Sequence, residues 1–341
     1  MAYTTINKST DYFNTKLYTG NGGTQSITGV GFQPDWVWGK ERTSTSSHFV
    51  FDAVRGATKN IHTNTTAAET TPSPDGGLTS FDSDGFSTSS WGAINESGQT
   101  YASWNWKAGG AGSTNYDGSI NSTVSANTTS GFSIVKWTGT GSNATIGHGL
   151  ASVPKFIIVK NLSTTGNWIT YNSYNGNTDY MYLNQNGASS STVQAWNNTS
   201  PTSSVISLGI SSEVNGSGND MIAYCFAEKT GYSKFGSYTG NVNVDGAFVY
   251  TGFAPSFLII KRTAGTQNWY MWDNKRLGYN PDNNHLQANG NNTEGTADTL
   301  DILSNGFKIR ESGSGTNSGT FIYIAFGQSI VGSNNVPATS R

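Results

Sequence analysis

Short runs of alternating apolar and polar residues recur along the whole chain, separated by turns rich in glycine, asparagine and serine. Segments 36–38, 104–106 and 269–272 are the clearest of these runs, and each carries bulky rings. A period of two residues is typical of β-strands, whose successive side chains point to opposite faces of a sheet. Helical periodicity is absent, because glycine interrupts nearly every candidate segment. The pattern therefore predicts an all-β protein.

One apolar strand pattern that ends in a lysine occurs three times, at 32–40, 153–160 and 253–261. In every copy the lysine lies six residues after a proline. A ring follows eight residues after each lysine, and an aspartate or asparagine follows twelve residues after it. The lysines are Lys40, Lys160 and Lys261, the rings are His48, Trp168 and Trp269, and the last set is Asp52, Asn172 and Asp273. Fixed offsets of this kind indicate tandem repeats.

We expect three tandem β-sandwich (jelly-roll-like) repeats of about 100 residues, since each copy also begins and ends with a strand pattern. The predicted repeats span residues 11–110, 131–231 and 232–332. A Gly/Ser/Thr-rich segment at 111–130 is interpreted as a linker that is flexible in its first part. Residues 1–10 and 333–341 are predicted to be terminal tails.

Charge and cysteine content narrow the range of partners. Only 12% of the residues are charged, the net charge is −2, and no basic run exists, so we expect no nucleic-acid partner. The single Cys225 excludes an intrachain disulfide framework and a cysteine-rich zinc site. Residues 1–7 show no signal-peptide pattern, and no apolar run approaches about 18 residues. We therefore expect a protein that is neither conventionally secreted nor membrane-spanning.

The repeated lysines have two interpretations. They could present one binding residue three times, or they could end core strands and extend their ammonium groups into water or toward the aspartate position. The second interpretation is favoured, because Asn172 replaces the aspartate in one copy and breaks any shared acid–base pair.

The sequence offers little evidence for a metal site or for catalysis. Asp82 and Asp84 precede Gly85 as in the start of a calcium loop, but the later ligands are missing, and a hairpin turn explains both this segment and the Asn305-Gly306 segment. The four histidines have no paired metal spacing, and neither a nucleophilic serine motif nor a phosphate loop is found. We expect no enzymatic activity, cofactor or metal.

Aromatic residues are abundant, with 10 Trp, 16 Tyr and 16 Phe. Rings on the outer face of a strand suit sugar stacking or subunit contacts, and rings on the inner face build a core. Trp38, Trp168, Trp269 and Trp272 are the candidates for glycan or subunit contact, and packing in the sandwich core and between domains is the favoured alternative.

The motifs above, together with segments 116–127, 146–150 and 335–341, resemble a family of repeat domains in virion structural and fibre-like proteins of tailed bacteriophages, especially marine ones. The resemblance covers residues 11–341. It implies a non-enzymatic component of the virion, released by lysis, that assembles with other copies of itself, commonly as a trimer, and with other virion proteins. It supplies no catalytic residue.

We therefore expect an appendage such as a tail fibre or spike, or a decoration of the capsid or tail, with host adhesion through surface glycans as a further role. A carbohydrate-binding module array and a glycan-degrading tailspike are the alternatives. Receptor specificity is expected in the loops where the copies differ, at 57–77, 175–201 and 279–299.

Overall fold

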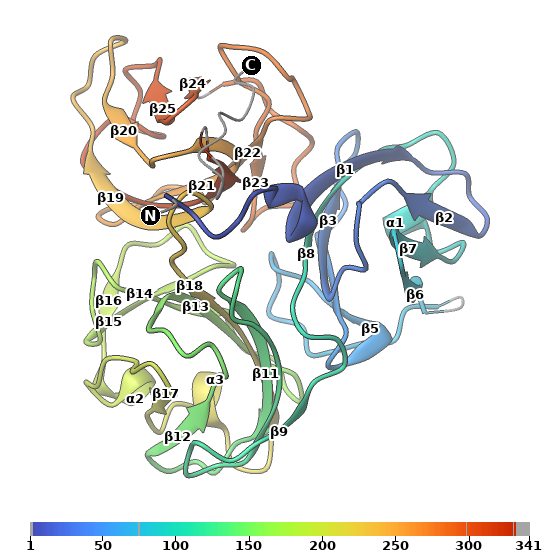
Figure 1. Ribbon diagram of the computed structural model, residues 1–341, viewed down its shortest axis with the longest axis vertical. Helices are drawn as coiled ribbons and strands as arrows, with labels where there is room; N and C mark the ends of the chain where they lie inside the picture. Colours follow the sequence, from blue (N-terminus) through green and yellow to red (C-terminus); the bar gives the residue numbers. More distant parts are fainter. Residues whose placement is uncertain (1–2, 74–75, 298, 330, 332–341) are drawn as a thin grey trace.

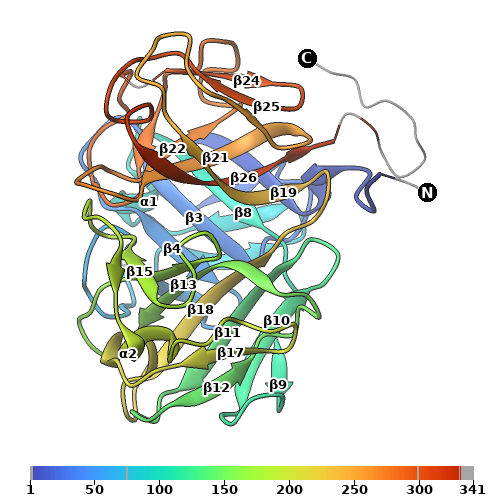
Figure 2. The same ribbon diagram turned by 90° about the vertical axis from the view of Figure 1, so that its left-hand side faces the viewer.

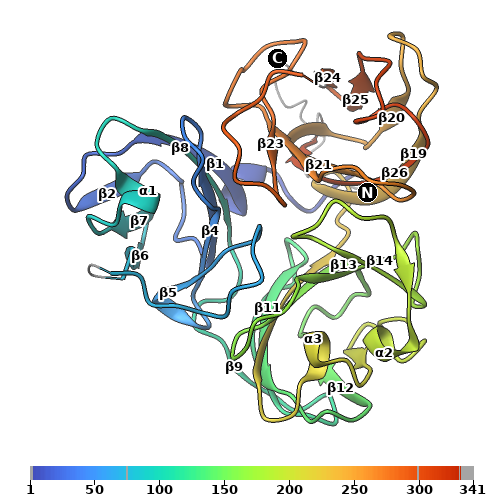
Figure 3. The ribbon, with the colours of Figure 1, turned by 180° about the vertical axis from the view of Figure 1, so that it is seen from behind.

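The computed structural model describes residues 3–73, 76–297, 299–329 and 331. It confirms the predicted all-β architecture. The helices of these residues are single turns: η1 (Ser9–Asp11), α1 (Gly92–Asn95), α2 (Val193–Trp196) and α3 (Ser212–Asn215). The strands form three lobes around a common centre, as Figures 1 and 3 show from opposite sides. We name them the first lobe (13–106), the second lobe (113–227) and the third lobe (233–328).

Each lobe pairs a large sheet with a small one, and all strand pairs are antiparallel. In the first lobe the large sheet runs β1 (Phe13–Thr19), β8 (Thr100–Trp106), β3 (Trp36–Glu41), β4 (Phe49–Asp52), β5 (Gly56–Ile61), and the small sheet runs β2 (Gln25–Thr28), β7 (Gly85–Thr88), β6 (Leu78–Asp82). In the third lobe the large sheet runs β19 (Ser233–Thr239), β26 (Thr320–Gln328), β21 (Ala254–Arg262), β22 (Tyr270–Asp273), β23 (Leu286–Gln287), and the small sheet runs β20 (Phe248–Tyr250), β25 (Gly306–Ile309), β24 (Leu300–Leu303).

The second lobe keeps the same central order and extends it at both edges. Its large sheet runs β16 (Ser190–Ser191), β15 (Asp179–Tyr182), β14 (Ile169–Asn172), β13 (Pro154–Asn161), β18 (Asp220–Ala227), β11 (Phe132–Thr138), β10 (Ser122–Asn127), β9 (Ser113–Asn115). Its small sheet pairs β12 (Ala144–Gly147) with β17 (Val205–Leu208). The last strand of each lobe, β8, β18 or β26, therefore lies between the first strand and the strand that carries the repeated lysine.

Alternation along these strands sorts side chains into two kinds of core. On β26, for example, Phe321, Tyr323 and Ala325 pack between the large and small sheets of the third lobe. The intervening Ile322, Ile324 and Phe326 point the other way, into a cluster that draws residues from all three lobes. We name it the central cluster. The same division holds for β8 and β18. The face that sequence analysis left open is thus buried between lobes.

Three equivalent rings meet where the lobes converge. Trp106, Phe226 and Phe326 each lie near the end of the last strand of their lobe. Their ring centroids are 6.4, 5.7 and 5.7 Å apart, which closes a triangle of edge-to-face contacts. Rings at these separations interact favourably beyond simple burial. In the side view the third lobe stands above the second, with the large sheets toward the middle (Figure 2).

The segment interpreted as a flexible linker requires correction. Within 111–130 the structure forms β9 and β10, and β10 pairs with β11 from Thr123 opposite Lys136 to Asn127 opposite Phe132. The glycines at 109–112 masked the alternation of Val124 and Ala126 with polar residues that follows them. The connection is therefore an integral edge of the second lobe.

The first residues also contact the third lobe. Ile6 is buried in the central cluster, and the backbone N–H of Ser9 donates to Gln328 Oε1 at 2.7 Å. Residues 1–2 and the predicted tail at 333–341, with the motif at 335–341, lie outside the described residues.

Candidate functional site

Two of the repeated lysines, Lys160 and Lys261, donate across the seams between lobes, whereas Lys40 donates to carbonyl oxygens of its own lobe, those of Glu41 and Ser44. All three are buried, with at most 1% of each side chain exposed. Lys160 Nζ donates to the carbonyl oxygens of Thr66 and Gly166 at 3.2 and 2.9 Å, and Lys261 Nζ donates to those of Asn186 and Gln267 at 3.1 and 2.8 Å. The expected contacts with water or with the aspartate position are therefore wrong, because the neighbouring lobe covers the strand end.

Burial lowers the pKa of Lys40, Lys160 and Lys261 to about 8 in each case. Two carbonyl acceptors per ammonium compensate part of the lost hydration. Lys160 binds a carbonyl of the first lobe and Lys261 binds one of the second, so these two lysines hold neighbouring lobes together by hydrogen bonds.

The rings eight residues after the lysines make a closed cycle of contacts. Trp168 Nε1 donates to the carbonyl oxygen of His62 at 2.8 Å, so the second lobe binds the first. Trp269 Nε1 donates to that of Tyr182 at 3.0 Å, so the third lobe binds the second. His48 Nε2 lies 2.9 Å from the carbonyl oxygen of Gln287, so the first lobe binds the third.

The histidine in this cycle is held as a neutral donor. His48 Nδ1 accepts from Trp38 Nε1 at 2.9 Å, which assigns the ring proton to Nε2. Burial, and then the charge of Lys40, lower the pKa of His48 to about 3. Histidine therefore substitutes for the tryptophan N–H of the other two seams without carrying charge.

The position twelve residues after the lysine differs between seams. Asp52 Oδ2 accepts from the Tyr224 hydroxyl at 2.7 Å, across the seam between the first and second lobes. Asp273 Oδ2 accepts from Trp104 Nε1 at 3.0 Å, across the seam between the third and first lobes. Each carboxylate therefore has a donor from the adjacent lobe.

At the seam between the second and third lobes the donor is missing. Ile324 has the register of Trp104 and Tyr224, because all three lie opposite the residue two before a repeated lysine. Ile324 and Asn172 line the same narrow crevice. An isoleucine cannot donate a hydrogen bond, and the residue facing it is the neutral Asn172 rather than an aspartate. This explains the exception that sequence analysis left without a cause.

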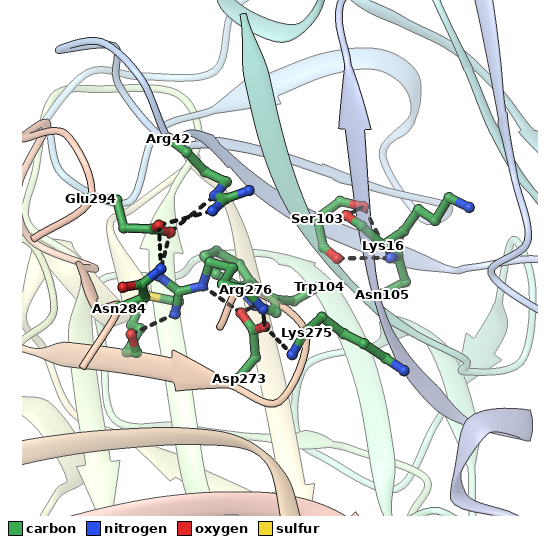
Figure 4. A network of polar contacts seen from close by, with 11 residues as sticks. Lys16, Arg42, Ser103, Trp104, Asn105, Asp273, Lys275, Arg276, Asn284 and Glu294 are labelled. Atoms are coloured by element: carbon green, nitrogen blue, oxygen red, sulfur yellow. Dashed lines mark hydrogen bonds and ion pairs between the residues drawn. The ribbon is translucent and has the colours of Figure 1, made fainter. Parts of the chain in front are cut away.

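Asp52 and Asp273 each belong to a charged network. Arg276 Nε donates to Asp273 Oδ2 at 2.7 Å, and Glu294 binds both Arg276 and Arg42 of the first lobe, with Arg42 Nη2 at 2.9 Å from Oε1 (Figure 4). Burial alone would raise the pKa of Asp273, but the Arg276 guanidinium and the Trp104 N–H outweigh it and the pKa is lowered. The network is therefore ionised and closed.

The corresponding positions of the other two seams also make networks, one charged and one neutral. At the seam between the first and second lobes the network is Asp52, Arg55 and Glu69. At the seam between the second and third lobes the matching contacts are neutral: Asn172 Oδ1 accepts from the backbone N–H of Asn175, whose side chain donates to Ser189 Oγ at 2.7 Å. The backbone N–H groups of Glu69, Ser189 and Glu294 all donate to the next lobe, to the carbonyl oxygens of Leu162, Thr263 and Arg42.

The predicted tryptophan contacts are wrong. Trp38, Trp168 and Trp269 lie in the central cluster, and Trp272 lies in the core of the third lobe. None is more than 1% exposed. The alternative interpretation, packing in the core and between domains, is the one that the structure supports, because a neighbouring lobe covers the second face of their strands. These four side chains cannot reach a glycan or another subunit.

The acidic pair is a turn, as the hairpin interpretation predicted. Asp82 pairs with Gly85 at the end of the β6–β7 hairpin, and Leu303 pairs with Gly306 in the third lobe. Asp84 accepts from the backbone N–H groups of Gly29 and Gly31, so its carboxylate caps a neighbouring loop. A Cβ on Gly85 would lie 1.9 Å from the Ile27 carbonyl oxygen, which explains the glycine.

A crevice between the first and third lobes is the strongest candidate binding site. Its volume is about 520 Å³, within the range typical of small-ligand sites. Thr15 of β1 lines one side, and Asn274, Lys275 and Asp282 line the other. Tyr279, which is 70% exposed, also lines it.

Several polar atoms of this crevice have no hydrogen-bond partner among the described residues. They are Thr15 Oγ1, Asn274 Oδ1 and both carboxyl oxygens of Asp282, on which the Asn284 N–H acts electrostatically without the geometry of a full hydrogen bond. Thr15 is 5% exposed and Asp282 is 2% exposed. Burial raises the pKa of Asp282 to about 7, although Arg276 and the Asn284 N–H offset part of the rise. Buried polar atoms are normally satisfied, so this concentration calls for a ligand or water.

An insertion that is specific to the third lobe builds this side of the crevice. Asp273 and Gln287 are 14 positions apart, whereas Asp52 and His62, like Asn172 and Tyr182, are 10 apart. Sequence analysis placed Tyr279 and Asp282 in a variable loop but did not identify them as site residues. The longer spacing was the available signal.

Metal and membrane features are absent from the described residues. No group of three or more His, Cys, Asp or Glu side chains there is arranged to hold a metal ion. No helix of that part of the chain is long and apolar enough to cross a membrane.

Comparison with known proteins gives one match. The model of a family described as a domain of unknown function, DUF7483, matches residues 8–329. No curated protein and no solved structure matches the chain.

Proposed function

The chain belongs to the DUF7483 family, and we propose that it is a non-enzymatic structural protein of a bacteriophage virion. It forms an appendage, such as a fibre or spike, or decorates the capsid or tail. The motif resemblance described above supports the particle assignment, and the three lobes are interpreted as tandem jelly-roll-like repeats. Contact with host-surface glycans is part of the proposal.

The central cluster supports the proposal that the three lobes form one rigid module. Residues from all three lobes share one aromatic core, and Trp106, Phe226 and Phe326 join the lobes at its middle. Lobes that share a buried core cannot swing independently, in contrast to domains joined by small polar interfaces. A rigid module of this kind suits a projecting or surface-covering part of a particle.

Further copies of the chain would have to associate through outer faces. The inward faces of the large sheets are already buried within one chain. A trimer of this protein, with other virion proteins as neighbours, therefore places its contacts on the loops and small sheets.

Mass spectrometry of purified particles tests the particle assignment directly. The protein is expected at a fixed copy number per particle, and its absence from washed particles would overturn the proposal. Scanning calorimetry of the isolated chain tests the rigid-body part, with one cooperative transition expected. Three separate transitions would show that the lobes are independent.

A carbohydrate-binding protein without a particle role is the second candidate. The crevice between the first and third lobes is the observation that favours it. Glycan binding by a protein that is absent from particles would distinguish it from the first candidate.

A further inference from the structure

We propose that the crevice between the first and third lobes binds a neutral, hydroxyl-rich oligosaccharide, with Asp282, Asn274 and Thr15 receiving its hydroxyl groups and Tyr279 packing against a sugar face. This inference rests on the glycan-contact part of the proposed function, which assigns no residues to that contact.

The unpartnered atoms define what the ligand must offer. When ionised, Asp282 presents two oxygens that accept hydrogen bonds, and when protonated it donates from one of them. Asn274 presents a third acceptor oxygen, and Thr15 presents a hydroxyl that both donates and accepts. A ligand must therefore bring several donors into a small volume. A sugar ring carries such donors on adjacent carbons, so one ring can satisfy more than one of these oxygens.

The charges around the crevice favour a neutral ligand. The Asp282 carboxyl repels an acidic sugar, with Asp273 and Glu294 close enough to raise its pKa further. Lys275 lines the crevice, and Arg276 acts on Asp282 from the buried network. These cations disfavour an amine or a metal ion. Only an uncharged ligand meets the acceptors without opposing one of the two sets.

The exposed tyrosine supplies the apolar part of the contact. Tyr279 is 70% exposed and lines the crevice. An aromatic ring can cover the C–H face of a sugar while the sugar hydroxyls reach polar groups deeper in the site. The site thus combines an exposed aromatic ring with buried polar side chains that lack partners.

The insertion that lines this crevice distinguishes the third lobe from the other two. The segment from Asn274 to Asp282 belongs to the lengthened spacing found in the third lobe alone. In the first lobe the matching segment includes β5, which pairs with β4, and in the second lobe it includes β15, which pairs with β14. In the third lobe the matching strand β23 also pairs with β22, but the added residues before it include Asn274 and Asp282, which line the crevice and have buried side-chain oxygens without partners.

Binding to defined probes tests the inference. Titration calorimetry on the full chain would use maltotriose, chitotriose and mannotriose as neutral probes, 3′-sialyllactose as the acidic probe and spermidine as the cation. Binding of at least one neutral probe is expected, with weaker or no binding of the acidic and cationic probes. Tighter binding of sialyllactose or spermidine than of every neutral probe would overturn the inference.

Variants locate the site. Tyr279→Ala is expected to weaken neutral-probe binding roughly tenfold, since it removes the aromatic platform. Thr15→Val, which keeps the shape of the side chain, is expected to weaken it severalfold. Tyr116→Ala is the matched control, because Tyr116 is 73% exposed and does not line the crevice. Unchanged thermal unfolding would show that each variant is folded.

The outcomes separate this inference from the proposed function. Neutral-probe binding that survives Tyr279→Ala and Thr15→Val would overturn the crevice assignment while leaving glycan contact in place. Failure of every neutral probe to bind would overturn both the crevice assignment and the glycan part. The virion assignment would then still be decided by the composition of particles.

Discussion

The seam between the third and first lobes and the seam between the second and third lobes solve the same packing problem with opposite chemistry. The first uses a buried Asp273–Arg276–Glu294 network, whereas the second uses neutral amide and hydroxyl contacts at the same positions. The difference follows the neighbouring lobe, which offers a Trp104 donor in one case and an apolar Ile324 in the other. A carboxylate occurs where the adjacent lobe can satisfy it. The cost of burying an unpaired charge explains this distribution.

Removing the side chain twelve residues after the lysine should produce the largest difference in stability between the two seams. Asp273→Ala leaves the Arg276 guanidinium, which is fully buried, without its closest partner. We expect a loss of about 4 kcal/mol in the free energy of unfolding at pH 7, measured by urea denaturation. The matched change at the neutral seam, Asn172→Ala, should cost about 1 kcal/mol. Equal losses would contradict the contrast.

Between about pH 4 and pH 7 the charged seam has a pH dependence that comes from Asp282. Burial raises the pKa of Asp282 to about 7, so between about pH 4 and pH 7 the folded chain keeps a proton that the unfolded chain releases. The ionised carboxyl therefore destabilises the folded state, fully above pH 7 and not at all below about pH 4. Asp282→Asn should raise the free energy of unfolding by about 3 kcal/mol at pH 8 and leave it unchanged at pH 4.

The control for this prediction is Asp117→Asn, since Asp117 is exposed. It should change stability by only a few tenths of a kcal/mol at either pH. A gain for Asp282→Asn that is the same at pH 4 and pH 8 would show that the carboxyl does not titrate as described.

Transplanting the charge should test whether the donor is required. Asn172→Asp places a carboxylate opposite Ile324, and we expect a loss of about 2 kcal/mol at pH 7. Adding Asn175→Arg restores the arginine found three residues after the aspartate at the other seams, and should recover about half of that loss. Denaturation of the single and double variants measures both effects. An Asn172→Asp variant with an unchanged free energy of unfolding would contradict the explanation.

The smallest effect should come from removing one donor. Tyr224→Phe deletes the hydroxyl that donates to Asp52 but leaves Arg55 in place. We expect a loss of about 1 kcal/mol, smaller than for Asp273→Ala because no charge is left unpaired. Tyr232→Phe is the comparison, since the Tyr232 hydroxyl is buried without a partner in the described residues and should lose less. A reversed order would contradict the donor role.

The strand pattern was readable from the sequence because it depends on local spacing. The alternation and the offsets from Lys40, Lys160 and Lys261 located strands that the structure contains. The partners of those residues were not readable, because contacts such as His48 with Gln287 join positions 239 residues apart with no fixed local relation. For the same reason the buried face of Trp38 and Trp269 was taken as a candidate contact surface.

The crevice illustrates a second limit. Its residues come from β1 and the segment before it, near the start of the chain, and from several segments of the third lobe, so no motif in one stretch could identify it. Only the longer interval between Asp273 and Gln287 marked the place, and a loop length does not reveal which side chains are left without partners. Burial and satisfaction of polar atoms are properties of the assembled lobes.

The cyclic seams have a consequence for synthesis. The third lobe completes two of the three seams, and its last strand β26 carries Phe326, which contacts Phe13 from the first strand. A nascent chain that holds only the first two lobes can close the seam between them, but the rings that contact the third lobe, such as Phe13 and Phe226, stay exposed to water until β26 has emerged. Premature termination would therefore yield a fragment that is prone to aggregate rather than a smaller functional protein. Folding is complete only when the final hundred or so residues have packed against the start of the chain.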